Sequence, residues 1–219
     1  MNVGRVNFPN LKPRFRGVSH EVAFFVSVAC GIFLVLWAPA GRPRTGAIIF
    51  SASLSAMFLA STVYHRPNWK KYGVRRWLGR LDRAMIFFLI AGTFTPFGLA
   101  LTSGWVRFLL PLVWIYAIVA AAVLFLPSKS KAPKWAIVLP YLIMGWIGVL
   151  AWPAMYRNFG IAPLSLIVAG GALYTAGAII YSRKRPNPMP LVFGYHEIFH
   201  ALVIAAALCH FVAVAIVVA

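Results

Sequence analysis

Two histidines stand four residues apart near the C-terminus, in the string His196-Glu197-Ile198-Phe199-His200. On a helix, this spacing places both imidazoles on one face, one turn apart. That arrangement is common for two ligands of one metal ion. Zinc takes about four tetrahedral ligands, and a catalytic zinc uses about three protein groups plus a water. The two histidines are therefore candidate zinc ligands, and a third ligand must come from elsewhere in the chain.

Three more polar residues lie inside or at the ends of long apolar runs. His65 ends one run and Asp82 opens the next, while Ser61 lies one helical turn before His65. A charged group at the centre of a membrane span costs about 2.5–3.5 kcal/mol, so such residues point to function by default. We predict that His65 is the third zinc ligand, that Asp82 is the nearest acidic group, and that the Ser61 hydroxyl points into the same pocket.

The string around His196 also matches the metalloprotease pattern H-E-x-x-H, in which Glu197 would be the general base. In that class the third ligand follows the motif, but no acidic residue follows His200, and Ala206 stands where a metzincin has its third histidine. His210 lies about 15 Å further along a helix, too far to share the ion. The sequence therefore disfavours a protease built on Glu197.

Other histidines have simpler explanations. His20 and Glu21 stand at the start of the first apolar run, where we expect helix capping or contact with lipid headgroups. We interpret His210 as a hydrogen-bonding residue of the core. A purely structural explanation also stays open for the gathered histidines, which would then be satisfied polar groups within a bundle.

The composition places these residues in a membrane protein. Hydrophobic residues make up 62% of the 219 residues and charged residues 11%, whereas a soluble domain carries about 25% charged residues. The net charge of +18 would suggest nucleic acid in a soluble protein. Here the basic residues lie in short segments between apolar runs, which favours contact with membrane lipids and excludes nucleic acid as a partner. Cys30 and Cys209 lie inside apolar runs and predict no disulfide framework.

Seven apolar runs approach the roughly 20 residues needed to span a bilayer. The first run is longer than the roughly 7–15 residues of a signal-peptide core, so we predict that it stays uncleaved. Backbone in lipid must satisfy its own hydrogen bonds, so we predict an all-α bundle of seven transmembrane helices. Residues 1–20 would form a basic N-terminal segment, and residues 21–219 the transmembrane domain. The predicted spans are residues 21–39, 46–65, 82–102, 107–126, 135–152, 162–181 and 192–218.

The distribution of basic residues predicts the orientation. Most basic residues lie on one side of the predicted membrane. They occur before the first span, in the connections between spans two and three, four and five, and six and seven, or at the edge of a neighbouring span. The exceptions are Arg42, Arg44, Arg107 and Arg157. The positive-inside rule then gives a cytoplasmic N-terminus and an outer C-terminus in the inner (plasma) membrane. The candidate site falls in the cytoplasmic half. Residues 69–78, which mix aromatic and basic side chains, are expected to form an interfacial loop.

Several stretches together resemble the haemolysin III family, the bacterial branch of the progestin and adipoQ receptor (PAQR) proteins. The resemblance implies a seven-helix fold with a cytoplasmic N-terminus. It also implies zinc held by His65, His196 and His200, with Asp82 close by through water and Ser61 in the same motif. The matching stretches are Ser61-Thr-Val-Tyr-His65, Arg80-Leu-Asp82, Ala91-Gly-Thr-Phe-Thr-Pro96, Gly194-Tyr-His-Glu-Ile-Phe-His200 and His210-Phe211.

The resemblance also bears on activity. Adiponectin receptors carry glutamine at the position of Glu197, which argues against that residue as an obligatory base. Related receptors and alkaline ceramidases imply amide hydrolysis of lipids, and bacterial members are linked to membrane lipid homeostasis. We predict a zinc-dependent hydrolase of a lipid-like amide or ester, in which Asp82 transfers the proton and Ser61 hydrogen-bonds the oxyanion. The alternatives are a receptor-like protein with structural zinc and a haemolysin-type pore.

Overall fold

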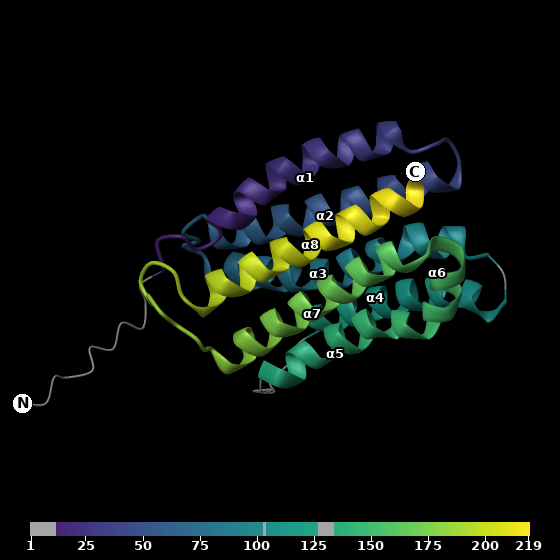
Figure 1. The fold of residues 1–219 in the computed structure, drawn as a ribbon. Helices are drawn as coiled ribbons and strands as arrows, with labels where there is room; N and C mark the ends of the chain where they lie inside the picture. Colours follow the sequence, from purple (N-terminus) through teal and green to yellow (C-terminus); the bar gives the residue numbers. More distant parts are fainter. Residues whose placement is uncertain (1–11, 103, 127–133) are drawn as a thin grey trace, which may run out of the picture.

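The regular elements of the described residues are helices, as predicted (Figure 1). The structure is a computed structural model that describes residues 12–102, 104–126 and 134–219. Seven segments are long and apolar enough to cross a membrane, which confirms the predicted seven-helix membrane architecture. In chain order the elements are α1 (Val18–Trp37), α2 (Arg42–His65), α3 (Tyr72–Ala100), η1 (Trp105–Phe108), α4 (Leu109–Phe125), α5 (Lys134–Trp146), η2 (Ile147–Ala151), α6 (Trp152–Phe159), α7 (Ile161–Arg183) and α8 (Tyr195–Val218).

Two elements differ from the predicted spans. Helix α3 begins at Tyr72, ten residues before the predicted start at residue 82, so most of the expected interfacial loop is helical. The fifth crossing extends to Phe159 and consists of α5, the 3-10 turn η2 and α6. Proline lacks a backbone N–H and suits the first turn of a helix. Pro153 directly follows the predicted end of the span at residue 152 and stands in the first turn of α6, where it suits the start of a helix.

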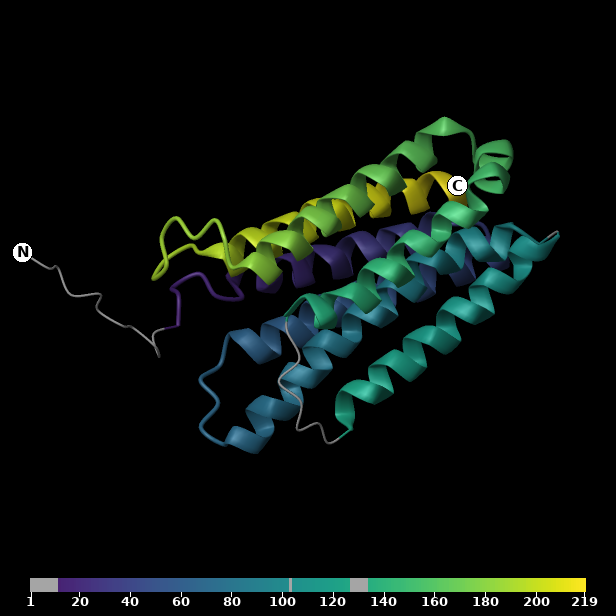
Figure 2. The same ribbon diagram turned by 90° about the horizontal axis from the view of Figure 1, so that it is seen from below.

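The order of packing explains how distant residues meet. Helix α1 packs against α2, α2 against α3, α3 against α4, and α7 against α8, while α5 contacts both α3 and α7. Helix α8 also contacts α1, α2 and α3, so the last helix closes the bundle against the first three (Figures 1 and 2). The end of α2, the early part of α3 and the starts of α1 and α8 lie at one end of the molecule, here called the site end. The opposite end, where α8 finishes, is the far end.

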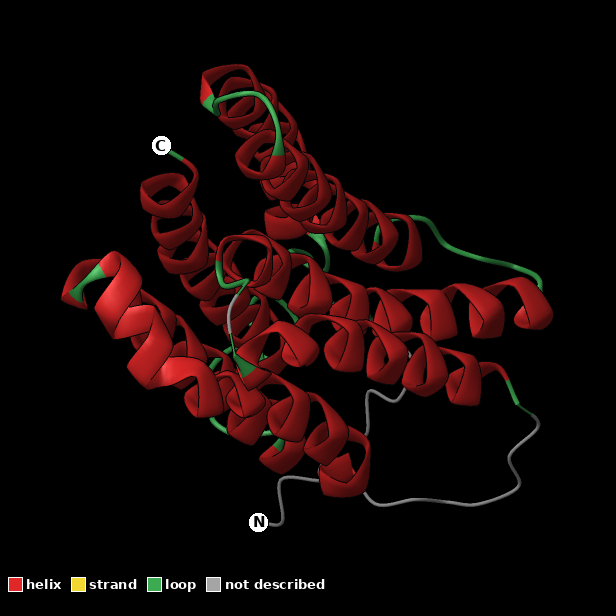
Figure 3. Ribbon diagram, turned by 90° about the vertical axis from the view of Figure 1, so that its right-hand side faces the viewer, coloured by secondary structure: helices red, strands yellow, loops and turns green. Residues whose placement is uncertain are grey.

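The side chains sort as expected for a protein dissolved in lipid. Two buried apolar clusters fill the interior. The larger draws most of its residues from α1, α2, α3 and α8 and a few from the segments η1 to α7, and the smaller lies among α3, α4 and α5. Large apolar side chains such as Phe33 and Leu208 are 68% and 63% exposed. Figure 3 shows the bundle of helices from the side that lies on the right in Figure 1. Which end faces the cytoplasm stays a prediction, and Arg5, Lys129 and Lys131, used in the charge argument, lie outside the described residues.

Candidate metal centre

The start of α8 is fixed by its own side chains. Glu197 reaches back so that its Oε2 accepts a hydrogen bond from the backbone N–H of Gly194, at 2.9 Å. Gly194 is the N-cap residue, which directly precedes the helix. A glutamate three residues after the N-cap commonly accepts a hydrogen bond from the free backbone N–H of that residue. Helix α8 consequently begins at Tyr195, and His196 and His200 fall in its first two turns.

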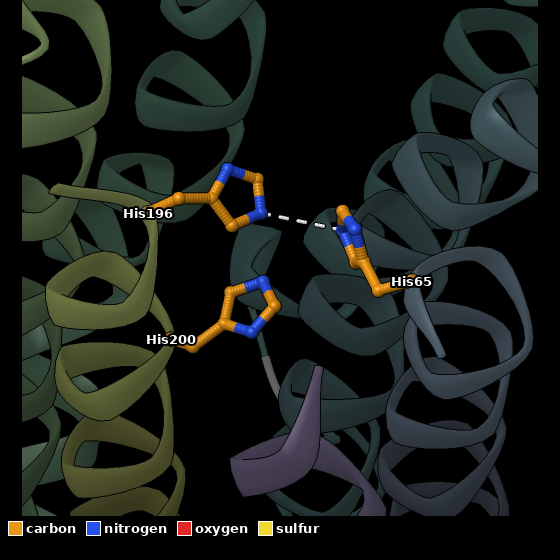
Figure 4. A group of neighbouring side chains, drawn as sticks. All are labelled: His65, His196 and His200. Atoms are coloured by element: carbon orange, nitrogen blue, oxygen red, sulfur yellow. Dashed lines mark hydrogen bonds between the residues drawn. The ribbon is translucent and has the colours of Figure 1, made fainter. Parts of the chain in front are cut away.

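The three histidines predicted to bind metal come together at the site end. His65 is the last residue of α2. One nitrogen from each of His65, His196 and His200 lies within 4.8 Å of the other two. Figure 4 shows the three rings converging, with the Nε2 atoms of His196 and His65 3.2 Å apart. His65 is 8% exposed and His200 2% exposed, so these two rings are shielded from solvent, while His196 is partly buried.

This donor set fits a zinc ion. Two nitrogens bound to one tetrahedral zinc, each about 2.05 Å from it, are about 3.3 Å apart. The His65–His196 pair already has this spacing at 3.2 Å, and all three histidine nitrogens lie within 4.8 Å of one another. Neutral imidazole is a preferred zinc ligand. Three ligands also match the number that a catalytic zinc takes from its protein. The geometry therefore supports a three-histidine metal site contributed by α2 and α8.

Asp82 lies beside the three histidines but is not part of the group that their ring nitrogens form. Its Oδ2 is 3.6 Å from Nε2 of His65, which is too long for a direct hydrogen bond. The two other acidic residues of the chain, Glu21 and Glu197, each pair with an arginine. Within the described residues, Asp82 alone among the three pairs with a histidine. It is therefore the carboxylate best placed to exchange a proton near the metal site.

Ser61 is buried at the site and contacts a histidine that we did not assign to it. The Ser61 Oγ lies 2.8 Å from Nδ1 of His20. His20 is 2% exposed, and its ring stacks on the ring of His200. The expectation that His20 caps a helix or touches headgroups was therefore wrong. The reason is that α1 begins at Val18, which turns His20 toward α2 and α8 rather than toward solvent.

Glu197 has a structural role in the described residues. Its Oε1 accepts a hydrogen bond from Nε of Arg16 at 2.5 Å, while its Oε2 holds the N–H of Gly194. Glu197 is only 3% exposed. Because both oxygens are occupied, the geometry gives no support to a general base at this position. The sequence analysis missed Arg16, which it treated as one of several basic residues near the membrane.

The segment before α1 closes over the histidines. Gly17 has a φ of 80°, and a Cβ placed on it would lie 2.7 Å from Cβ of His65, so glycine permits this close approach. The backbone N–H of Arg14 donates to the carbonyl of Leu191 at 2.9 Å. Lys12 Nζ donates to the carbonyl of Arg66 at 2.6 Å. Burial, assisted by the charges of Arg66 and two other arginines, lowers the pKa of Lys12.

A largely apolar cavity of about 240 Å³ leads away from the site. It is lined at one end by His20, Ser61, Asp82 and the three grouped histidines. Its lining follows α3 from Asp82 to Leu101, about 28 Å of helix. His210 lines the cavity further along, and its Nε2 lies 3.2 Å from the carbonyl of Ile167. This contact confirms His210 as a hydrogen-bonding residue of the core, separate from the metal group.

Comparisons with known proteins agree with this architecture. Residues 8–211 match the family described as Haemolysin-III related. A Hemolysin-3 homolog of Bacillus subtilis is 29% identical over 197 residues, which cover 89% of this chain and 88% of that protein. Hemolysin-3 of Bacillus cereus is 30% identical, with coverages of 87% and 84%. The rice heptahelical transmembrane protein ADIPOR2 is 31% identical over 190 residues, with coverages of 80% and 82%.

Proposed function

Since this integral membrane protein belongs to the haemolysin-III related family, we propose that it is a zinc-dependent hydrolase of a lipid-like amide or ester. One observation carries the proposal. Asp82 and Ser61, which suit proton transfer and oxyanion binding, line the same cavity as the three grouped histidines. A purely structural metal site would need neither residue nor a cavity beside it. The proposed setting is the plasma membrane, with membrane lipid homeostasis as the process served.

The metal-binding residues in this proposal are His65, His196 and His200. Zinc bound there would lower the pKa of a bound water toward about 7 and polarise a substrate carbonyl. The protein contributes the fixed positions of the ligands. His65 ends α2 and the other two lie in the first turns of α8, so the packing of α2 against α8 assembles the site.

Asp82 and Ser61 divide the remaining chemistry. Asp82 accepts a proton from the attacking water and returns it to the leaving nitrogen or oxygen, as a general base and then a general acid. Its distance of 3.6 Å from His65 leaves it free of a direct hydrogen bond to that ring. The Ser61 hydroxyl donates a hydrogen bond to the oxyanion that develops on the substrate.

The shape of the cavity supports a lipid-like substrate. Its walls are mainly hydrocarbon and aromatic side chains from α3, α5 and α7, which would bury an acyl chain. Its lining along about 28 Å of α3 is close to the roughly 30 Å thickness of the hydrocarbon layer of a bilayer. The polar head of such a lipid would then lie beside the histidines.

A structural zinc in a receptor-like protein is the second candidate, and one observation favours it. The histidine group joins α2 to α8, which are far apart in the chain, and a metal there would tie the bundle together. A pore, suggested by the name Hemolysin-3 of the Bacillus cereus relative, would need a polar path through the membrane. The cavity lining becomes largely apolar toward Leu101, which disfavours a pore.

Asp82→Asn tests the hydrolase against the structural candidate. We expect purified Asp82→Asn protein to keep its zinc content while turnover of fluorescent N-acyl and O-acyl lipids falls by about 10²- to 10⁴-fold, the usual contribution of a general acid–base. Zinc is measured by elemental analysis and turnover by product release. Zinc-loaded wild type that hydrolyses neither lipid class, yet loses thermal stability when zinc is removed, would favour the structural candidate.

A further inference from the structure

His20 makes more contacts with the candidate site than its place in the sequence suggests. It lies in the first turn of α1, and its ring contacts Phe58 of α2 and His200 of α8. Its Nδ1 is 2.8 Å from the Ser61 Oγ. Its ring lies parallel to that of His200, with centroids 3.7 Å apart and an angle of 5° between the planes. One side chain thus touches both a metal-binding candidate and the oxyanion-binding candidate.

The packing around His20 restricts its ring further. The ring of Phe58 meets it edge-on, with centroids 5.0 Å apart. Burial to 2% exposure leaves the imidazole little room to rotate. The ring of His200 must therefore lie against a surface whose orientation α1 and α2 have already fixed. A ligand held in this way loses less conformational freedom when it binds a metal.

Stability alone does not explain a histidine at this position. The Nε2 of His20 is buried and makes no hydrogen bond of ordinary geometry to another described residue. A buried polar atom without a partner carries a desolvation cost. A phenyl ring would fill similar space without that cost. Such exceptions in native proteins are expected where the polar group serves a purpose other than packing.

We propose that His20 is a positioning residue of the site, which holds the Ser61 oxygen by donating a hydrogen bond from Nδ1–H, so that the serine proton stays available for the oxyanion, and which braces the ring of His200 by stacking. The inference rests on the proposed function and adds a fourth histidine to the residues that it needs. The two contacts use different parts of the side chain. The ring face acts on the metal ligand, and the Nδ1 atom acts on the serine, so the two effects are separable by substitution.

Two substitutions separate the effects in the full-length protein. His20→Asn keeps a polar atom near the Nδ1 position but removes the ring. We expect its zinc affinity, measured by competition with a chelator, to fall about 10- to 100-fold, as for other residues that orient metal ligands. His20→Phe keeps a ring against His200 but cannot hold Ser61. Its zinc affinity should stay within about threefold of wild type, while turnover falls about tenfold or more.

Replacing zinc with Co²⁺ gives a visible absorption spectrum that reports the geometry of the metal ligands and does not respond to a general loss of packing. We expect the visible absorption bands of bound Co²⁺ to change in His20→Asn and to stay unchanged in His20→Phe. Ser27→Ala is the matched control, because Ser27 is buried two turns further along α1 and hydrogen-bonds Ser55 of α2 at 3.0 Å. If His20→Asn matched Ser27→Ala in zinc affinity and in cobalt spectrum, bracing of His200 would be refuted.

A measurement without metal separates this inference from the proposed function. In ¹⁵N-histidine-labelled, metal-free protein, Ser61→Ala should shift the Nδ1 resonance of His20, because it removes the hydrogen-bond partner. An unchanged resonance would refute the contact with Ser61, whether or not zinc binds. If instead wild type took up no zinc while the resonance shifted, the proposed function would fail and the hydrogen bond would stand.

Discussion

The two ends of the helix bundle are built from opposite kinds of side chain. At the site end, the buried residues include His20, Ser61, His65, Glu197 and His200. At the far end, the buried side chains are hydrocarbons packed together, which include Leu101, Val106, Leu109, Val214 and Val218. Both ends bury their side chains to a similar degree. The contrast therefore lies in chemistry and not in how tightly the helices pack.

This contrast is what the proposed function would require of the site end. Hydrocarbon side chains close the far end without any need for hydrogen bonds. Polar groups at the site end must each find a partner or bear a desolvation cost. Arg16 and Arg66 supply partners for Glu197 and Glu21, at 2.5 Å each. A bundle that needed only stability could have closed both ends in the same way, so the polar end is the part that function explains.

The sharpest test of the contrast uses two histidines on the same helix. We expect His200→Ala to lower zinc affinity by more than about 100-fold. Loss of a residue that only orients a metal ligand lowers affinity about 10- to 100-fold, and loss of the ligand itself should lower it further. His210→Ala should leave zinc affinity within about threefold of wild type, since Nε2 of His210 contacts the carbonyl of Ile167 instead. Equal zinc content in the two purified variants, measured by elemental analysis, would refute the site.

The ion pair at the site end gives a second, smaller test. Glu197→Gln keeps an oxygen for the N–H of Gly194 but removes the charge that faces Arg16. Hydrogen bonds to charged groups contribute about 1.5–3 kcal/mol. We expect the melting temperature to fall by a few degrees, with turnover and zinc affinity within about threefold of wild type. Loss of turnover with zinc retained would instead support Glu197 as a general base.

Much of the fold and part of the site could be predicted because membranes impose simple rules. Apolar length predicted the seven crossings, and the depth of His65 relative to His196 and His200 predicted their meeting. The same depth argument applies to His20, which opens the first span at the same end. We assigned it to capping because periodicity does not show which way a side chain faces at the first turn of a helix. Only the packing of α1 on α2 decides that.

The segment before α1 was harder to predict for a different reason. Its contacts join residues far apart in sequence, such as Arg16 with Glu197 and Arg14 with Leu191. Basic residues near a membrane have a sufficient explanation in orientation and headgroup contact. Nothing in their spacing distinguishes an arginine that pairs with a buried glutamate. Such pairs become visible only when the helix ends are placed in three dimensions.

Two glycines, one at each end of the bundle, provide the smallest test. Gly17 precedes α1 at the site end and Gly41 precedes α2 at the far end, with φ values of 80° and 97°. Alanine should be strained at both, by roughly 1–3 kcal/mol, and should lower both melting temperatures. Only at Gly17 would the new Cβ meet another residue, 2.7 Å from Cβ of His65, whereas at Gly41 nothing lies within 4 Å.

Zinc affinity should therefore distinguish the two alanine variants although both have lowered melting temperatures. Gly17→Ala forces either the start of α1 or His65 to move, so we expect zinc affinity to fall about three- to tenfold. This is no more than the smallest loss, about tenfold, that follows removal of a residue that orients a metal ligand. Gly41→Ala should bind zinc as wild type does. Because alanine strains the backbone at both positions, an equal change in zinc affinity would mean that the contact of Gly17 with His65 does not position the ligand.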